Sequence, residues 1–311
     1  MTFEVTILGS SSALPTSQRF PSAHVLNVHE RLFLIDCGEG TQIQLRNFKL
    51  KLSRLHHIFI SHLHGDHTLG LVGLISTLNL LGRKQPLTIH AHQELQPILE
   101  QNINFFVNEL QFKLIFQALD KKRHKPIYED ERITVEAVPL KHRIPSTGFI
   151  FREKPKLPNI KKHLIERYSI PLADIVKIKH GADFTTSSGV TIPNSELTYI
   201  ASKPRSYAYC SDTKYFEKLA EMVKDVDLLY HEATFGSDKE KMARATGHST
   251  AKEAATTAKK AGAKKLIIGH FSSRYKDVNV LLNEARQIFP ETFAAEDGVT
   301  FSVNDKKSES S

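Results

Sequence analysis

The chain has 311 residues, of which 40% are hydrophobic and 24% charged, and its formal net charge is +8. This length allows one large α/β domain or two small ones, and the composition is typical of a globular protein with a sizeable core. No apolar run approaches the roughly 18 residues that span a bilayer, and the N-terminus lacks the hydrophobic region of a signal peptide, so we expect a cytoplasmic protein without membrane segments.

The net charge bears on the kind of partner, and the cysteine content bears on the compartment and on the type of metal site. An excess of Lys and Arg is typical of proteins that bind a polyanion, because these side chains neutralise phosphates. A lysine-rich solvated surface explains the same excess, so charge alone does not distinguish a polyanion-binding protein from one with a solvated basic surface. The two cysteines, Cys37 and Cys210, form no paired motif. They fit a reducing compartment and exclude a cysteine zinc site.

The first part of the chain alternates between β-type runs and helical patterns. Leu69, Val72, Leu78 and Leu81 are spaced for a helix over 68–81, with Gly82 at its end, and a second helix is expected at about 93–106. The predicted strands of this part are Phe3–Gly9, Ala23–Val28, 32–36, 55–61, Leu87–Ala91, 112–116 and 132–139.

From 152 to 196 the regular pattern stops, because Pro, Gly and Ser interrupt it and lysines are frequent. We expect an inserted extended arm with one short helix at about 159–168. Strands at 206–211, 228–230 and 266–268 follow.

A helix of the last part begins at Thr250, which forms a capping-box pattern with Glu253, and it ends at Gly262. The polar tail, 305–311, is predicted to be disordered.

Three imidazoles and one carboxylate lie within six residues, directly after the apolar run at 55–61. They are His62, His64, Asp66 and His67. Alternate residues after a strand point the same way, and imidazole and carboxylate groups are ligands that suit zinc. The alternative is a histidine-rich surface loop without metal, but this spacing after an apolar strand favours a metal site.

Four ligands in one loop cannot close two metal sites, so others should follow at strand ends. His142, Asp212 and His270 each come just after a β-type run. Each of them taken singly is explained by a structural or solvated role. Together, three such residues at successive strand ends predict one shared site.

The histidine cluster and the distant His, Asp and His resemble the metallo-β-lactamase superfamily. Over essentially its whole length the chain resembles the ribonuclease Z family within it. The further matching pieces are Leu8-Gly9-Ser10, Pro15-Thr16, Arg19, Ile35-Asp36-Cys37-Gly38-Glu39-Gly40-Thr41-Gln42, His231-Glu232-Ala233-Thr234-Phe235, Gly247-His248-Ser249-Thr250 and Gly269-His270-Phe271-Ser272-Ser273-Arg274-Tyr275.

The resemblance implies an α/β fold, a four-layer αββα sandwich over residues 1–304, with the arm at 152–196 inserted. It also implies two zinc ions per subunit. The first zinc would lie on His62, His64 and His142, and the second on Asp66, His67 and His270, with Asp212 bridging both.

The resemblance assigns catalytic roles as well. Asp66 would take the proton of the attacking water. His248 would protonate the leaving oxygen, with His231 and Glu232 positioning it, since an imidazole suits proton transfer near neutral pH. The alternative for His248 is a residue that merely packs beside Ser249 at the start of a helix.

In this family the arm binds transfer RNA, and members commonly form homodimers. The candidate RNA-binding residues are Lys154, Lys156, Lys161, Lys162, Lys177, Lys179 and Arg274. Phosphate contacts by such lysines set position rather than sequence preference. The alternatives are a solvated arm and, for Arg274, an exposed arginine in a tight turn.

The implied activity is endonucleolytic removal of the 3′ trailer from precursor transfer RNA, which leaves a 3′-hydroxyl on the transfer RNA and a 5′-phosphate on the trailer. The alternative enzyme is a small-molecule phosphodiesterase or arylsulfatase of the same fold. A third hypothesis is a metal-stabilised RNA-binding protein without turnover, in which Asp66 and His248 would be dispensable.

Overall fold

The structure is a computed structural model that describes residues 1–107, 109–121, 123–200 and 202–303. These residues form two compact units. The first contains Met1–Asp130, Thr134–Phe151 and the residues from Arg205, and the second contains Glu131–Ile133 and Arg152–Pro204. The predicted disordered tail, 305–311, lies outside the described residues.

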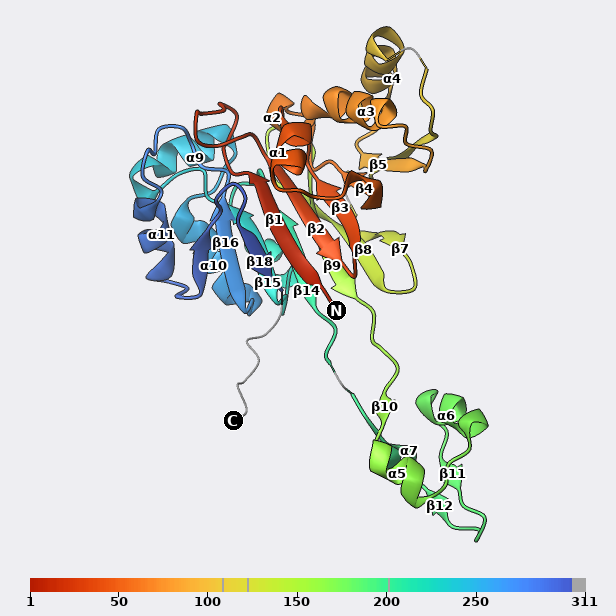
Figure 1. Cartoon of the computed structure of the whole chain (residues 1–311). Helices are drawn as coiled ribbons and strands as arrows, with labels where there is room; N and C mark the ends of the chain where they lie inside the picture. Colours follow the sequence, from red (N-terminus) through yellow and green to blue (C-terminus); the bar gives the residue numbers. More distant parts are fainter. Residues whose placement is uncertain (108, 122, 201, 304–311) are drawn as a thin grey trace. The chain divides into compact units, whose positions relative to one another are not determined.

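The first unit contains two sheets of seven strands each (Figure 1). The first sheet has the order β18-β1-β2-β3-β4-β5-β6. Its strands are β1 (Phe3–Gly9), β2 (Ala23–Val28), β3 (Arg31–Ile35), β4 (Leu55–Phe59), β5 (Leu87–Ala91), β6 (Leu114–Ala118) and β18 (Thr300–Ser302).

The second sheet has the order β17-β16-β15-β14-β9-β8-β7. Its strands are β7 (Lys125–Glu129), β8 (Ile133–Leu140), β9 (Ser146–Glu153), β14 (Ser206–Cys210), β15 (Leu228–Glu232), β16 (Lys265–Gly269) and β17 (Thr292–Ala294). The strands β14, β15 and β16 run parallel, and so do β3, β4 and β5 in the first sheet.

Helices cover the outer face of each sheet, which gives the predicted four layers. The helices α1, α3 and α4 accompany the first sheet, and α10 and α11 the second (Figure 1). The helix α8 packs on α10. The helices of the first unit are α1 (Thr41–Asn47), η1 (Leu52–Arg54), α2 (Gly65–Thr68), α3 (Gly70–Leu80), α4 (Leu95–Phe106), α8 (Lys218–Met222), η2 (Ser237–Lys239), α9 (Glu240–Thr246), α10 (Ala251–Ala261) and α11 (Asn279–Arg286).

Aromatic rings join the inner faces of the two sheets. Phe33 of β3 contacts Phe151 of β9 with ring centroids 5.8 Å apart, and Phe59 of β4 lies 5.4 Å from Phe149. All four rings are fully buried. Large rings at offset or edge-on geometry bury much apolar area, so this layer holds the sheets at a fixed separation.

The helix predicted at 68–81 is present as α3. A short α2 that was not predicted precedes it, so Asp66 and His67 lie within a helical turn rather than a loop. The strand β9 was not predicted. Its side chains are nearly all buried, and a fully buried strand lacks the alternation that marks one in sequence.

The second unit has its own small apolar core. Its elements are β10 (Asn159–Ile160), α5 (Lys162–Arg167), α6 (Leu172–Lys179), β11 (Phe184–Thr185), β12 (Thr191–Ile192), α7 (Asn194–Leu197) and β13 (Thr198–Tyr199). Its core side chains are Ile160, Leu164, Ile170, Ile178, Phe184, Ile192 and Leu197.

The short helix expected at about 159–168 is present as α5, but the expectation that the insertion holds only one helix was wrong. Pro171, which belongs to the prolines interpreted as interruptions, stands immediately before α6, and Pro193 stands immediately before α7. Proline is tolerated at the start of a helix, because the first backbone N–H groups have no partner within the helix.

Among the described residues, no helix is long and apolar enough to cross a membrane.

The predicted capping box of α10 is present and allows a test of stability. Thr250 Oγ1 accepts the backbone N–H of Glu253, and the Glu253 carboxylate accepts the backbone N–H of Thr250. We expect Thr250→Ala to lower the free energy of unfolding by about 1 kcal/mol. Thr256→Ala, within the same helix, is the control and should change it little, since Ala favours helices. Equal losses in chemical denaturation would contradict this account of the cap.

Candidate metal and catalytic site

The predicted ligands come together at the carboxyl ends of strands from both sheets. His62 follows β4, His142 follows β8, Asp212 follows β14 and His270 follows β16. Parallel strands end at the same edge of a sheet, so these turns deliver side chains to one place. His270 itself has a positive φ of 59°, a conformation that non-glycine residues adopt rarely and that is often found at functional sites.

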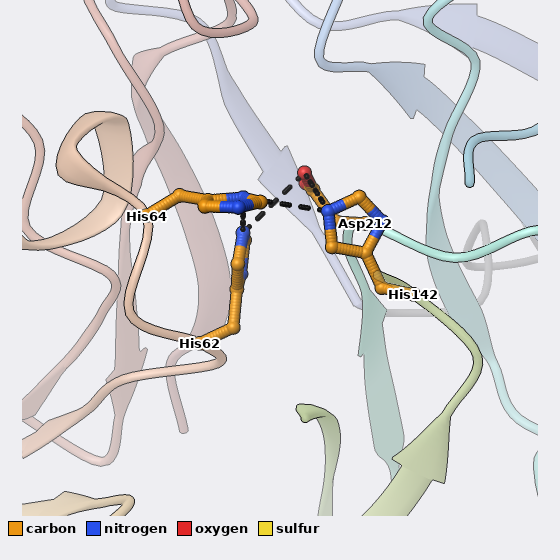
Figure 2. Close-up of side chains that lie close together, drawn as sticks. All are labelled: His62, His64, His142 and Asp212. Carbon is orange, nitrogen blue, oxygen red and sulfur yellow. Dashed lines mark hydrogen bonds and ion pairs between the residues drawn. The ribbon is translucent and has the colours of Figure 1, made fainter. Parts of the chain in front are cut away.

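Three histidines and one carboxylate oxygen form the first group (Figure 2). His62 Nε2 lies 2.9 Å from His64 Nδ1, and His142 Nε2 lies 3.4 Å from the same atom. Asp212 Oδ2 is 3.4 Å from His62 Nε2 and 3.6 Å from His142 Nε2. The four side chains therefore point at a common centre.

A second group lies on the other side of Asp212. Asp66 Oδ2 is 3.4 Å from both His67 Nε2 and His270 Nε2. Asp212 Oδ1 is 3.3 Å from His67 Nε2 and 3.2 Å from His270 Nε2. Each oxygen of Asp212 thus faces a different group of ligand-type side chains.

The hydrogen-bond partners of the histidines fit metal binding. The Nδ1–H groups of His67, His142 and His270 donate to the Asp36 carboxylate at 2.7 Å, the Gly247 carbonyl at 2.8 Å and Thr234 Oγ1 at 2.9 Å. These bonds leave the lone pair of each Nε2 facing the group, as in proteins whose ligands are oriented by such partners.

One buried atom makes the same point independently. His67 Nε2 is buried and makes no hydrogen bond within the described part of the chain, although the Asp66 and Asp212 oxygens lie 3.4 and 3.3 Å from it. An unpartnered buried nitrogen is costly unless something else binds it, and a divalent cation does so. The donor set of imidazole nitrogens and carboxylate oxygens suits such a cation.

The two carboxylates of the site are ionised. Burial alone would raise the pKa of Asp212, but His270, His62 and His67 lower it well below its ordinary value. Burial also acts to raise the pKa of Asp66, and His67 and His270 outweigh it, so this pKa is lowered as well.

His248 lies beside the two groups and is held by Glu232. Its Nδ1 is 2.8 Å from Glu232 Oε1 and 3.3 Å from Thr234 Oγ1, and its side chain is 11% exposed. Burial alone would lower the pKa of His248, but the Glu232 carboxylate outweighs it and raises this pKa to about 9. The ring can therefore carry a proton on Nε2 while Nδ1–H donates to Glu232.

The turn before His248 requires glycine. Gly247 ends α9 with a positive φ of 78°, and a Cβ there would lie 3.1 Å from His142 Nδ1. The missing side chain lets the 247–248 turn pack against His142.

His231, the other residue of β15 that was predicted to be catalytic, does not point toward His248. His231 is fully buried, and its Nδ1 bonds the carbonyl oxygen of Glu232 at 2.7 Å. Neighbouring residues of a strand face opposite sides of the sheet, so His231 and Glu232 side chains diverge. Only Glu232 reaches His248, and a role for His231 stays a prediction.

Sequence reasoning missed two positioning residues. Asp36, at a positive φ of 58° after β3, accepts bonds from His67, from Ser61 and from the Tyr209 hydroxyl at 2.7 Å. Thr234 donates to Glu232 Oε2 at 2.6 Å. Both lie in motifs that the resemblance singled out, but the spacing of the residues does not reveal their partners.

The two groups and His248 open into a cavity of about 480 Å³. Arg274 lines it, as do Ser12, Leu69, Arg143 and Phe235. The six lysines predicted to bind RNA all belong to the second unit, where Lys156, Lys162 and Lys177 are exposed and the other three are half-buried.

Comparison with known proteins agrees with this geometry. Residues 3–289 match the family model described as anti-Pycsar protein Apyc1. A protein named ribonuclease Z from Phocaeicola vulgatus is 48% identical over 305 residues, which are 98% of this chain and 99% of that protein. One of the same name from Bacteroides thetaiotaomicron is 48% identical over 302 residues, covering 97% of this chain and 96% of the other.

Solved structures give the same result. Human tRNase Z, short form, superposes with a TM-score of 0.71 at 28% identity, covering 97% of this chain and all of that one. The metallo-beta-lactamase fold protein YhfI from Bacillus subtilis has a TM-score of 0.67 at 18% identity over 97% of this chain and 100% of its own, which shows a shared fold.

Two facing sheets with His and Asp side chains gathered at their strand ends define a metallo-β-lactamase-fold protein with a metal-binding type of site. At 48% identity over nearly the full length of both chains, the chain belongs to the ribonuclease Z family and to the family that the matching model describes.

Asp36 offers a test of the orienting bonds. We expect Asp36→Asn to weaken metal binding by about 10- to 100-fold, because an amide cannot replace the charge that holds His67 Nδ1–H. The measurement is metal loss to a competing chelator.

The matched control is Asp227→Asn. Asp227 also accepts backbone and side-chain bonds, from Ser206, but it precedes β15 at the opposite end from the site. Equal metal loss from both variants would contradict the role of Asp36.

Proposed function

We propose that this protein is a metal-dependent endoribonuclease that removes the 3′ trailer of precursor transfer RNA, leaving a 3′-hydroxyl on the transfer RNA and a 5′-phosphate on the trailer. The observation that carries the proposal is the meeting of both ligand groups with the His248–Glu232 pair in one open cavity. The relatives named ribonuclease Z and tRNase Z support RNA as the substrate.

We propose that the metal is zinc, with two ions per subunit. His62, His64 and His142 would hold one ion, Asp66, His67 and His270 the other, and Asp212 both. When bound, two such ions polarise a phosphodiester and lower the pKa of a water toward neutrality.

The chain's own residues would then move the protons. Asp66, ionised and lining the cavity, would orient the attacking water and accept its proton. His248 would donate the Nε2 proton to the leaving ribose oxygen, while Glu232 holds Nδ1. His231 would assist from behind the strand by bonding the Glu232 carbonyl.

The second unit is proposed as the RNA-binding arm, and the first as the catalytic domain. The six predicted lysines would contact phosphates, and Arg274 would do so in the cavity. A cytoplasmic homodimer is proposed on the family resemblance.

Small-molecule hydrolysis is the second candidate function. The two ligand groups would act on a single phosphodiester, and this chemistry does not depend on the groups attached to that phosphodiester. The same fold would then serve as a small-molecule phosphodiesterase or arylsulfatase. An arm with exposed lysines favours RNA, since a small substrate does not need it.

Metal content is the first test. We expect elemental analysis of gently purified protein to find two zinc ions per chain. Fewer than one metal ion of any kind per chain would contradict the metal site.

Cleavage is the second test. We expect the metal-loaded protein to cut precursor transfer RNA at its 3′ trailer, and His248→Ala to slow this by roughly 10²- to 10⁴-fold. The same variant should lose much less activity on bis(p-nitrophenyl) phosphate, because the acidic leaving group of that substrate needs little protonation.

The outcomes separate the hypotheses. Hydrolysis of bis(p-nitrophenyl) phosphate without cleavage of precursor transfer RNA would favour the small-molecule enzyme. RNA processing that survives both Asp66→Ala and His248→Ala would favour an RNA-binding protein without turnover.

A further inference from the structure

Two guanidinium groups line the cavity, from Arg143 and Arg274. The Arg274 guanidinium donates to Ser272 Oγ at 3.3 Å. Arg143 is exposed, and within the described residues its guanidinium makes no hydrogen bond or ion pair. An exposed guanidinium that lines the cavity and has no partner among the described residues is available for an anion.

Arg143 stands on the wall of the cavity that carries His248. A Cβ at Gly247 would lie 3.4 Å from both the backbone N and Cγ of Arg143. The neighbouring His142 Nδ1–H donates to the Gly247 carbonyl. The 142–143 segment is therefore packed on the turn that leads directly into His248.

Arg274 belongs to a different wall. The N-terminal loop bonds the segment after β16, with Ser12 N–H donating to the Phe271 carbonyl at 3.1 Å. Arg274 follows three residues after Phe271. The two guanidinium groups therefore enter the cavity from separate segments, and the Arg143 segment is the one that packs on Gly247, the residue before His248.

This placement assigns Arg143 to one part of the substrate. A polynucleotide carries a phosphate on each side of the scissile one, and His248 faces the leaving oxygen, which belongs to the strand on the 5′ side. Guanidinium groups bind phosphate through paired, charge-assisted hydrogen bonds. We propose that Arg143 binds the phosphate one nucleotide 5′ of the scissile bond and so positions the leaving strand beside His248, an inference that rests on the proposed function.

The test couples a charge on the protein to a charge on the RNA. Precursor transfer RNA is prepared with a neutral methylphosphonate at the linkage one nucleotide 5′ of the cleavage site, or at the first linkage on its 3′ side. Arg143→Met keeps an apolar stem of similar shape and removes the charge. Arg143→Lys restores a charge, and Arg123→Met is the control, because Arg123 is 80% exposed and lies outside the cavity.

We expect Arg143→Met and the 5′ methylphosphonate each to raise KM by about ten- to a hundredfold, the range for a hydrogen bond to a charged group. The two changes combined should raise KM no more than either change alone, because they remove the same interaction. Arg143→Lys should recover part of the loss. The 3′ methylphosphonate should add its effect independently, and Arg123→Met should show no coupling to either linkage.

Three results would overturn the inference. They are additive losses at the 5′ linkage, coupling at the 3′ linkage, and a loss with Arg143→Met on bis(p-nitrophenyl) phosphate as large as on RNA, which would place Arg143 on the scissile phosphate. The wild-type protein is assayed first. If it does not cleave precursor transfer RNA, the proposed function fails, and if it cleaves but the losses are additive, only the role of Arg143 fails.

Discussion

The carboxylate of Asp212 is the point on which the site depends. Its two oxygens face different groups of histidines, at 3.2 to 3.6 Å, although the residue is only 2% exposed. A buried carboxylate is unfavourable unless it is paired, so strands from both sheets must deliver imidazoles to both of its sides. The facing sheets, their aligned carboxyl ends and the left-handed turn at His270 all serve this requirement.

Hydrogen bonds then join the ligand-type side chains to His248, the proposed proton donor. His270 Nδ1–H donates to Thr234, the Thr234 hydroxyl donates to Glu232, and Glu232 accepts the Nδ1–H of His248. Because Thr234 accepts from His270 and donates to Glu232, this series of hydrogen bonds fixes the tautomers of His270 and His248 together. A ligand of the second group and the proposed general acid are therefore oriented by one buried network, and a change in Thr234 or Glu232 affects both.

The ligand-type residues could be predicted from sequence because each is a His or Asp directly after an apolar run, a local signal. Asp36 has the same local position, but its partners His67 and Tyr209 are 31 and 173 residues away, and Tyr209 lies on the other sheet. Similarly, β9 is too uniformly buried to show alternation, and the prolines before α6 and α7 look like interruptions without the packed core that those helices share. Local chemistry is visible in sequence, whereas partners brought together only by the fold are not.

The cluster cannot by itself select a substrate, because its ligands and His248 act only on the phosphodiester at the centre of the cavity. Selection has to come from groups that contact the rest of the polymer. In our proposals Arg143 is such a group at a distance of one nucleotide, and the lysines of the second unit are such groups farther along the RNA. The second unit has an apolar core of its own. Its surface lysines can therefore change without disturbing the buried network around Asp212. On the proposed function, affinity for RNA and chemistry at the scissile bond then depend on two different compact units of the chain.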